Sequence, residues 1–170
     1  MPDLLFREKN FVFSCRVAGV IVQSGRVLLQ KEPHDPGHAF PGGHVAAGET
    51  HAQTLIREFQ EELHADIAPG RLMAVGEVFF PWKDKPCHQI CLYYEAALIK
   101  PGQIPDDGVF HGYDELNHER INLDFLWVPL AKLPEIAVYP PEMAAYLTEN
   151  RQDVLHFIYN ELPEDTVWTR

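Results

Sequence analysis

The stretch GGHVAAGETHAQTLIREFQEELHA, residues 42–65, contains four glutamates and one arginine around the clearest helical pattern in the chain. This pattern predicts an amphipathic helix over residues 50–64 whose apolar stripe packs against a sheet. Thr50 and Gln53 have the spacing of a capping box at the start of that helix. The apolar stripe, at four-residue intervals, is formed by Leu55, Phe59 and Leu63.

The acidic side chains of this helix indicate a metal site. Glu58 lies three and four residues before Glu61 and Glu62, which predicts three carboxylates on one helix face. Like charges at this spacing destabilise a helix by about 0.2–0.5 kcal/mol per pair, and a bound cation reverses that effect. Carboxylate oxygens select hard ions, so we expect Mg²⁺ or Mn²⁺. The alternative for a bare ExxEE pattern is a solvated acidic face.

Six positions of the same stretch resemble the signature of the Nudix hydrolases, the MutT-like family, which reads G-x5-E-x7-R-E-U-x-E-E-x-G-U with U a bulky aliphatic residue. The matching residues are Gly43, Glu49, Arg57, Glu58, Glu61 and Glu62. The chain departs from the signature at three positions: His64 replaces the last glycine, Ala65 is small, and Phe59 is aromatic. Because histidine adopts the left-handed conformation less readily than glycine, the helix exit is expected to differ from the family's.

The resemblance implies a Nudix-type α/β/α sandwich with a mixed β-sheet. It implies that Glu58, Glu61 and Glu62 are metal ligands, with Glu62 and Glu58 foremost, and that the carbonyl of Gly42 adds another. Arg57 and Glu49 would orient the glutamates through an ion pair, within a structural box that includes Gly43. The alternative for Arg57 is an ordinary surface cation.

The activity that the resemblance implies is Mg²⁺-dependent hydrolysis of a phosphoric anhydride bond in a nucleoside diphosphate linked to another moiety. ADP-ribose-like nucleotide sugars are slightly preferred; the alternatives are a (d)NTP pyrophosphohydrolase and a non-catalytic nucleotide-binding module of the same fold. The catalytic set would comprise Arg57, Glu58, Glu61 and Glu62. A general base is expected among Glu61, Glu115, Glu119 and Glu142.

Other residues are candidates for contacts with the substrate. Among the few cations, Arg16, Arg26, Lys31 and His44 are candidates for phosphate contacts. Pro81 stands where relatives that act on ADP-ribose often carry a proline, although it also suits the end of a strand. Trp82 is a candidate for stacking on a base, the alternative being a core position.

The rest of the sequence predicts one α/β or α+β domain over residues 1–170. Two hairpins, a strand and a second helix are expected, with a polar loop between the second hairpin and the strand, and the segment 153–162 fits either helix or strand. The predicted hairpins cover residues 10–31 and 71–100, the loop 101–120, the strand 122–130 and the helix 140–150.

Composition limits the partners. A formal net charge of −11 argues against binding to nucleic-acid polymers or anionic membranes, and leaves a small nucleotide met by metal ions. The N-terminus lacks the pattern of a signal peptide, so a cytoplasmic protein is expected. The three cysteines, Cys15, Cys87 and Cys91, are expected as reduced, buried strand residues rather than zinc ligands. A homodimer is compatible with the sequence, which does not determine the oligomeric state.

Overall fold

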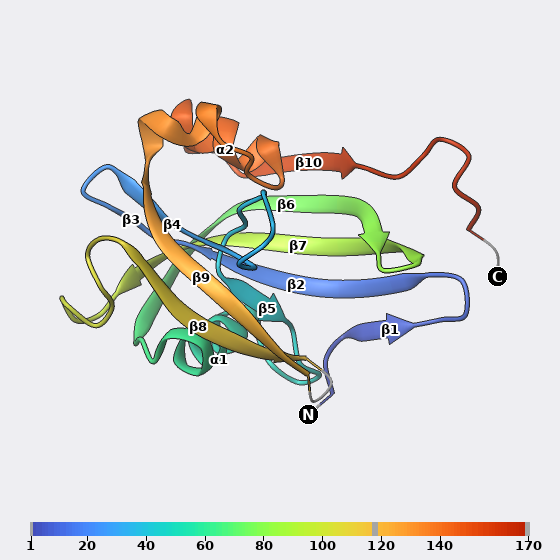
Figure 1. The fold of residues 1–170 in the computed structure, drawn as a ribbon, viewed down its shortest axis with the longest axis horizontal. Helices are drawn as coiled ribbons and strands as arrows, with labels where there is room; N and C mark the ends of the chain where they lie inside the picture. The colour runs from blue at the N-terminus through green and yellow to red at the C-terminus, as the bar shows by residue number, and fades with distance from the viewer. Residues whose placement is uncertain (1, 117–118, 169–170) are drawn as a thin grey trace.

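The computed structural model describes residues 2–116 and 119–168, without the side chains of residues 115, 116 and 119. Two β-sheets lie between helix α1 (His51–Leu63) and helix α2 (Pro141–Thr148), with α1 below and α2 above the strands in Figure 1. This arrangement is the predicted mixed α and β architecture, and both predicted helices are present.

The larger sheet is six-stranded and mixed. Its order is β1-β2-β7-β6-β10, with β5 paired to β2 beside that path. The pairs β2–β7 and β6–β10 are parallel, and the others are antiparallel. Its strands are β1 (Leu5–Arg7), β2 (Val12–Val20), β5 (Gly42–His44), β6 (Ile67–Trp82), β7 (Lys85–Leu98) and β10 (Leu155–Asn160).

The smaller sheet is four-stranded, in the order β3-β4-β9-β8, and leads into a 3-10 helix, η1 (Leu130–Glu135). The predicted turn at Ser24 and Gly25 joins β3 to β4, and both residues have positive φ angles, 52° and 72°. The predicted first hairpin is therefore divided, because β2 belongs to the other sheet. The strands are β3 (Val22–Gln23), β4 (Arg26–Lys31), β8 (Val109–Leu116) and β9 (Glu119–Pro129).

Helix α1 packs onto the strands through its predicted apolar stripe. Leu55 and Phe59 are fully buried, and Phe59 lies over Gly19 of β2. A Cβ at Gly19 would approach the Phe59 ring to 2.8 Å, so this position needs glycine for the helix to sit at this depth. The predicted capping box is present at Thr50 and Gln53. The buried stripe and the cap together fix the direction of the helix.

The predicted loop over residues 101–120 is wrong in its second half. Residues from Val109 onward form strand β8, and Glu119 already belongs to β9. This segment looks polar because β8 contains His111, Tyr113 and Asp114. Its pairing with β9 is a contact between strands that the local composition does not reveal. The loop proper ends before Val109.

Other boundaries also differ from expectation. The second hairpin was expected to begin at residue 71, but β6 starts at Ile67 and accommodates Pro69 and Gly70 through register shifts between Pro69 and Ala74. The ambiguous segment 153–162 contains strand β10, which pairs with β6 in parallel. Among the described residues, none of the helices is long and apolar enough to cross a membrane.

Candidate metal site and its surroundings

Helix α1 brings two of its three predicted carboxylates into the interior. Glu58 and Glu62, one helical turn apart, are buried at 5% and 4% exposure. The side chain of Glu61 is 60% exposed and lies 3.2 Å from a guanidinium nitrogen of Arg57. The three predicted ligands therefore do not converge on one point: the structure gathers Glu58 and Glu62, and leaves Glu61 at the rim.

A third carboxylate reaches this pair from the smaller sheet. Asp114, on β8, has a carboxylate oxygen that lies within 4.8 Å of oxygens from both Glu58 and Glu62. We call these three residues the acidic cluster. Sequence reasoning missed Asp114 because it assigned that segment to a loop, although it placed base candidates at the next acidic positions. The side chains of two of these candidates, Glu115 and Glu119, lie outside the described part of the chain.

The electrostatics of the acidic cluster are unfavourable without a cation. Neither carboxylate oxygen of Glu62 has a hydrogen-bond partner among the described residues. Burial raises the pKa of Glu62 well above its usual range, and the charge of Glu58 adds to this shift. Burial also raises the pKa of Glu58, to about 7, against the lowering effect of Arg57. Two buried acids, of which Glu62 has no hydrogen-bond partner among the described residues, have the chemistry of a hard-cation site, and Mg²⁺ or Mn²⁺ fits this donor set.

Arg57 ties the helix to the loop that precedes it. Its Nε donates to Glu49 at 3.0 Å, and its Nη1 donates to Glu58 at 2.6 Å. Its Nη2 donates to the carbonyl of His44 at 3.2 Å. Burial opposes the charge of Arg57, but the hydrogen bond that Arg57 donates to Glu49 and the charge of Glu58 outweigh it and raise the arginine pKa. The side chain thus holds Glu58 in place, as the predicted ion pair requires.

Of the two glycines that begin β5, Gly43 lies against the acidic cluster and Gly42 against the backbone of β2. A Cβ on Gly43 would lie 2.2 Å from the carboxyl carbon of Glu58, so only glycine leaves room for that carboxylate. Gly42 has a φ angle of +146°, and its carbonyl accepts a hydrogen bond of 2.8 Å from Arg16. The predicted ligand carbonyl is therefore already used in part. Arg16, predicted as a phosphate contact, is a buried cation whose charge lowers the pKa of Glu62 against burial.

The remaining predicted substrate contacts lie in different places. The Trp82 ring lies 5.8 Å from the ring of His44, at the end of β6 that also carries Pro81. Burial, followed by the charge of Arg16, lowers the pKa of His44 to about 4, so this ring is neutral at pH 7. Lys31 donates to the carbonyl of Asp35 instead. Among the predicted phosphate contacts in the described part of the chain, Arg16 is the cation whose charge acts on the acidic cluster.

Two further predictions concern residues away from α1. The base candidate Glu142, on α2, has one buried oxygen without a partner among the described residues. Burial is the main cause that raises the pKa of the deeply buried Tyr93, and the charge of Glu142 adds to this shift. Cys87 and Cys91 are buried and Cys15 is half-buried, all as free thiols, as expected for strand cysteines.

The model of the family described as the NUDIX domain matches residues 14–149. The protein named ADP-ribose pyrophosphatase from Methanocaldococcus jannaschii is 28% identical over 122 residues, which cover 65% of this chain and 71% of that protein. A Mycobacterium tuberculosis protein named as a candidate 8-oxo-dGTP diphosphatase is 43% identical over 65 residues, covering 36% of this chain and 44% of that protein.

The fold has relatives among solved structures. A NUDIX hydrolase from Nitrosomonas europaea superposes with a TM-score of 0.58 at 16% identity, over 91% of this chain and 82% of that one. Among the curated relatives cited, the aligned segment spans from 44% to 71% of their own length. Since the family model covers most of the chain, and the signature residues supply the Arg57 contacts and two of the three acids in the acidic cluster, this chain belongs to the NUDIX family.

Proposed function

We propose that this chain is an Mg²⁺-dependent pyrophosphohydrolase that cleaves a nucleoside diphosphate linked to another moiety. The observation that carries the proposal is Glu62, a buried carboxylate with both oxygens partnerless beside two further carboxylates. A scaffold role does not explain why two buried acids and a third, half-buried one are gathered together, because burying a carboxylate costs free energy unless a cation is present. A substrate made of phosphates and met by metal does explain it.

Glu58, Glu62 and Asp114 are the residues that would hold the metal. A bound Mg²⁺ supplies charge neutralisation at the phosphate oxygens and lowers the pKa of a water molecule. Arg57 keeps Glu58 oriented through the 2.6 Å hydrogen bond, and Glu49 keeps Arg57 in position. The two residues therefore act as positioning residues.

The proton released from the attacking water needs an acceptor near the acidic cluster. Glu61 stands at the rim, exposed to water, and so remains the nearest base candidate on α1. Glu142 is the alternative on α2. Replacement of each by glutamine distinguishes them, since loss of the base lowers kcat and removes the acidic limb of its pH profile.

We propose ADP-ribose-like nucleotide sugars as the first substrates to test and (d)NTPs as the second. The M. jannaschii relative is named for ADP-ribose and the M. tuberculosis relative for 8-oxo-dGTP, and these names support the two classes. Pro81 adds to the first class only through its distance from the signature.

The test measures nucleoside monophosphate and phosphate release from ADP-ribose, NADH, dinucleoside polyphosphates and (d)NTPs, each with Mg²⁺ and with EDTA. Glu62→Gln and Asp114→Asn are expected to lower kcat by at least about 100-fold, since metal stabilisation contributes several kcal/mol. Glu135→Gln, an exposed glutamate paired with Lys132, is the matched control and keeps full activity. Absence of cleavage, together with a nucleotide-induced rise in Tm, would instead identify a binding module.

A further inference from the structure

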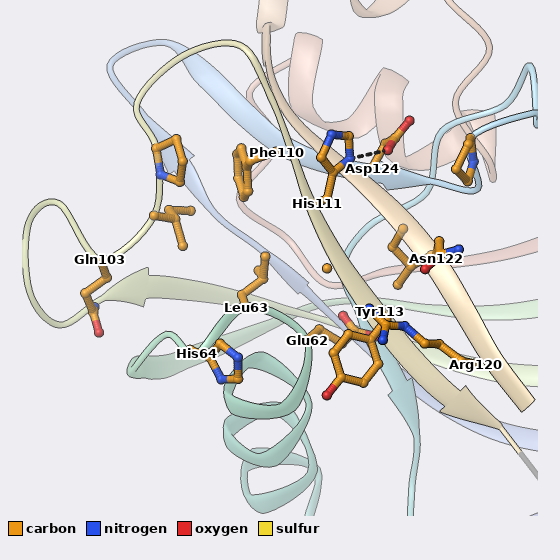
Figure 2. Close-up of a pocket in the computed structure, with 15 residues that line it drawn as sticks. Glu62, Leu63, His64, Gln103, Phe110, His111, Tyr113, Arg120, Asn122 and Asp124 are labelled. Carbon is orange, nitrogen blue, oxygen red and sulfur yellow. Dashed lines mark hydrogen bonds and ion pairs between the residues drawn. The ribbon is translucent and has the colours of Figure 1, made fainter. Parts of the chain in front are cut away.

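A cavity of about 680 Å³ opens beside the acidic cluster. It lies between the C-terminal end of α1, the loop before β8, and the β8–β9 hairpin (Figure 2). Glu62 belongs both to the lining of the cavity and to the acidic cluster, and Tyr113 of the lining directly precedes Asp114 on β8, so the cavity adjoins the cluster. A group attached to a phosphate at the cluster can therefore extend into it.

The walls of the cavity are fixed by hydrogen bonds within the protein. Gln103 brackets Asp66: it accepts from the Asp66 amide at 2.7 Å and donates to the Asp66 carbonyl at 2.9 Å. The indole of Trp127 donates to the carbonyl of Pro105 at 2.9 Å. Because these bonds hold the loop against the rest of the fold, the cavity is preformed rather than dependent on a ligand.

His64, which lines this cavity, has an unusual backbone conformation for a residue other than glycine. It ends α1 in the left-handed conformation, with φ 51° and ψ 35°, at the position where the family signature has glycine. A side chain in this conformation costs free energy relative to glycine, and within the described chain no hydrogen bond or ion pair of the imidazole offsets that cost. Instead, His64 lines the cavity. A strained residue at the wall of a cavity suggests a ligand contact.

The far end of the cavity carries a cation held on an aromatic ring. The guanidinium of Arg120 lies 4.0 Å from the ring centre of Tyr113. Tyr113 and Asn122 are paired across β8 and β9, so these polar groups come from neighbouring strands. Figure 2 shows Arg120 and Asn122 on the opposite side of the cavity from His64 and Gln103. Donors at both ends suit an elongated polar ligand.

Between these ends, the lining is apolar. The side chains that contribute are Leu63, Ile104, Phe110 and Leu123. Apolar and aromatic surface with a few donors at the margin is what a base and its sugar require, since the base needs a flat apolar contact and polar edges. The His111 and Asp124 side chains, which lie 2.7 Å apart, add a polar pair at the margin of this apolar surface.

We infer that this cavity holds the nucleoside part of the substrate, with His64 and Arg120 as its polar contacts, while the diphosphate lies at the acidic cluster. The inference rests on the proposed function for its link to turnover. It goes further because it assigns specificity to a residue that departs from the family signature. In this arrangement, the strain at His64 is retained because the imidazole recognises the ligand.

The first experiment measures binding of adenosine and guanosine by calorimetry in EDTA, so that neither phosphate nor metal takes part. At least one nucleoside is expected to bind, and His64→Ala and Arg120→Ala are each expected to weaken it by about three- to tenfold, the value of one hydrogen bond or cation–π contact. Arg151→Ala, which removes a cation 5.8 Å from the Tyr146 ring, is the matched control and leaves binding unchanged.

The second experiment measures KM and kcat of the same variants with the best substrate. His64→Ala and Arg120→Ala are expected to raise KM with little change in kcat, since they contact the nucleoside and not the reacting phosphate. The inference would be overturned if both variants kept the nucleoside affinity and the KM of the wild-type protein. It would also be overturned if the wild-type protein bound no nucleoside. Nucleoside binding that depends on these residues, without metal-dependent cleavage, would uphold the cavity and reject the hydrolase.

Discussion

The contact between Gly43 and Glu58 shows how a single hydrogen atom in place of a side chain shapes the acidic cluster. The φ angle of Gly43 is not positive, so its backbone conformation is open to other residues. What requires glycine is space, since the Glu58 carboxylate lies where a Cβ would be. The signature glycine is therefore a steric requirement of a buried acid.

Gly43→Ala is expected to displace the Glu58 carboxylate and to weaken Mg²⁺ binding by roughly 10- to 100-fold, the range for a disturbed ligand orientation. Calorimetric titration with Mg²⁺ measures the effect. Glu58→Asp shortens the side chain, so the double variant should lose less affinity than the sum of the two single changes. Strict additivity would show that the two residues do not interfere.

The C-terminal end of α1 illustrates an element whose geometry is kept although its sequence changes. A different helix exit was expected from the loss of glycine, and that expectation is wrong: His64 takes the left-handed conformation, and its amide donates to the carbonyl of Gln60 at 3.1 Å. The following amide of Ala65 donates to the carbonyl of Phe59 at 3.2 Å. These two hydrogen bonds satisfy carbonyls in the last turn of the helix. Together they outweigh the free-energy cost of the left-handed conformation at His64.

His64→Gly is expected to raise the free energy of unfolding by about 0.5–1 kcal/mol, which corresponds to roughly 1–4 °C in Tm for a chain of this size. Scanning calorimetry measures it. His64→Ala retains the left-handed penalty and serves as the control, without the gain. A lower Tm for the glycine variant would mean that the imidazole itself stabilises the helix end.

At the scale of the whole molecule, stability depends on pH through the acidic cluster. The pKa of Glu58 is about 7 in the folded protein and near 4.5 when unfolded. The folded state thus retains its proton to higher pH, and stability is lost as the pH rises from about 4.5 through 7. Full ionisation of this one group costs about 3 kcal/mol. Glu62 shifts in the same direction.

In EDTA, the wild-type protein is therefore expected to lose stability between pH 5 and pH 8, as measured by urea unfolding. Glu58→Gln should flatten this dependence because glutamine does not ionise. Saturating Mg²⁺ should restore stability at pH 8 and have little effect at pH 5, where the glutamates are protonated. An Mg²⁺ effect equal at both pH values would contradict a metal site at these residues.

Local features account for most of what the sequence predicted correctly. Helix α1, its capping box and the contact between Arg57 and Glu49 follow from spacings within the segment 49–64. Long-range pairing accounts for what was missed. Asp114 enters the acidic cluster because β8 pairs with β9, and the polar composition of that hairpin concealed a strand. Burial likewise separated Glu61 from Glu62, which the helical face alone did not distinguish.

The origin of the acidic cluster in two distant segments has a consequence for biosynthesis. Glu58 and Glu62 leave the ribosome well before Asp114, so the nascent chain holds two of the three acids while the third is still untranslated. Tight capture of a divalent ion must then await emergence of the β8–β9 hairpin. Ion capture would thus be one of the last steps of maturation and would mark a chain whose two sheets have already come together.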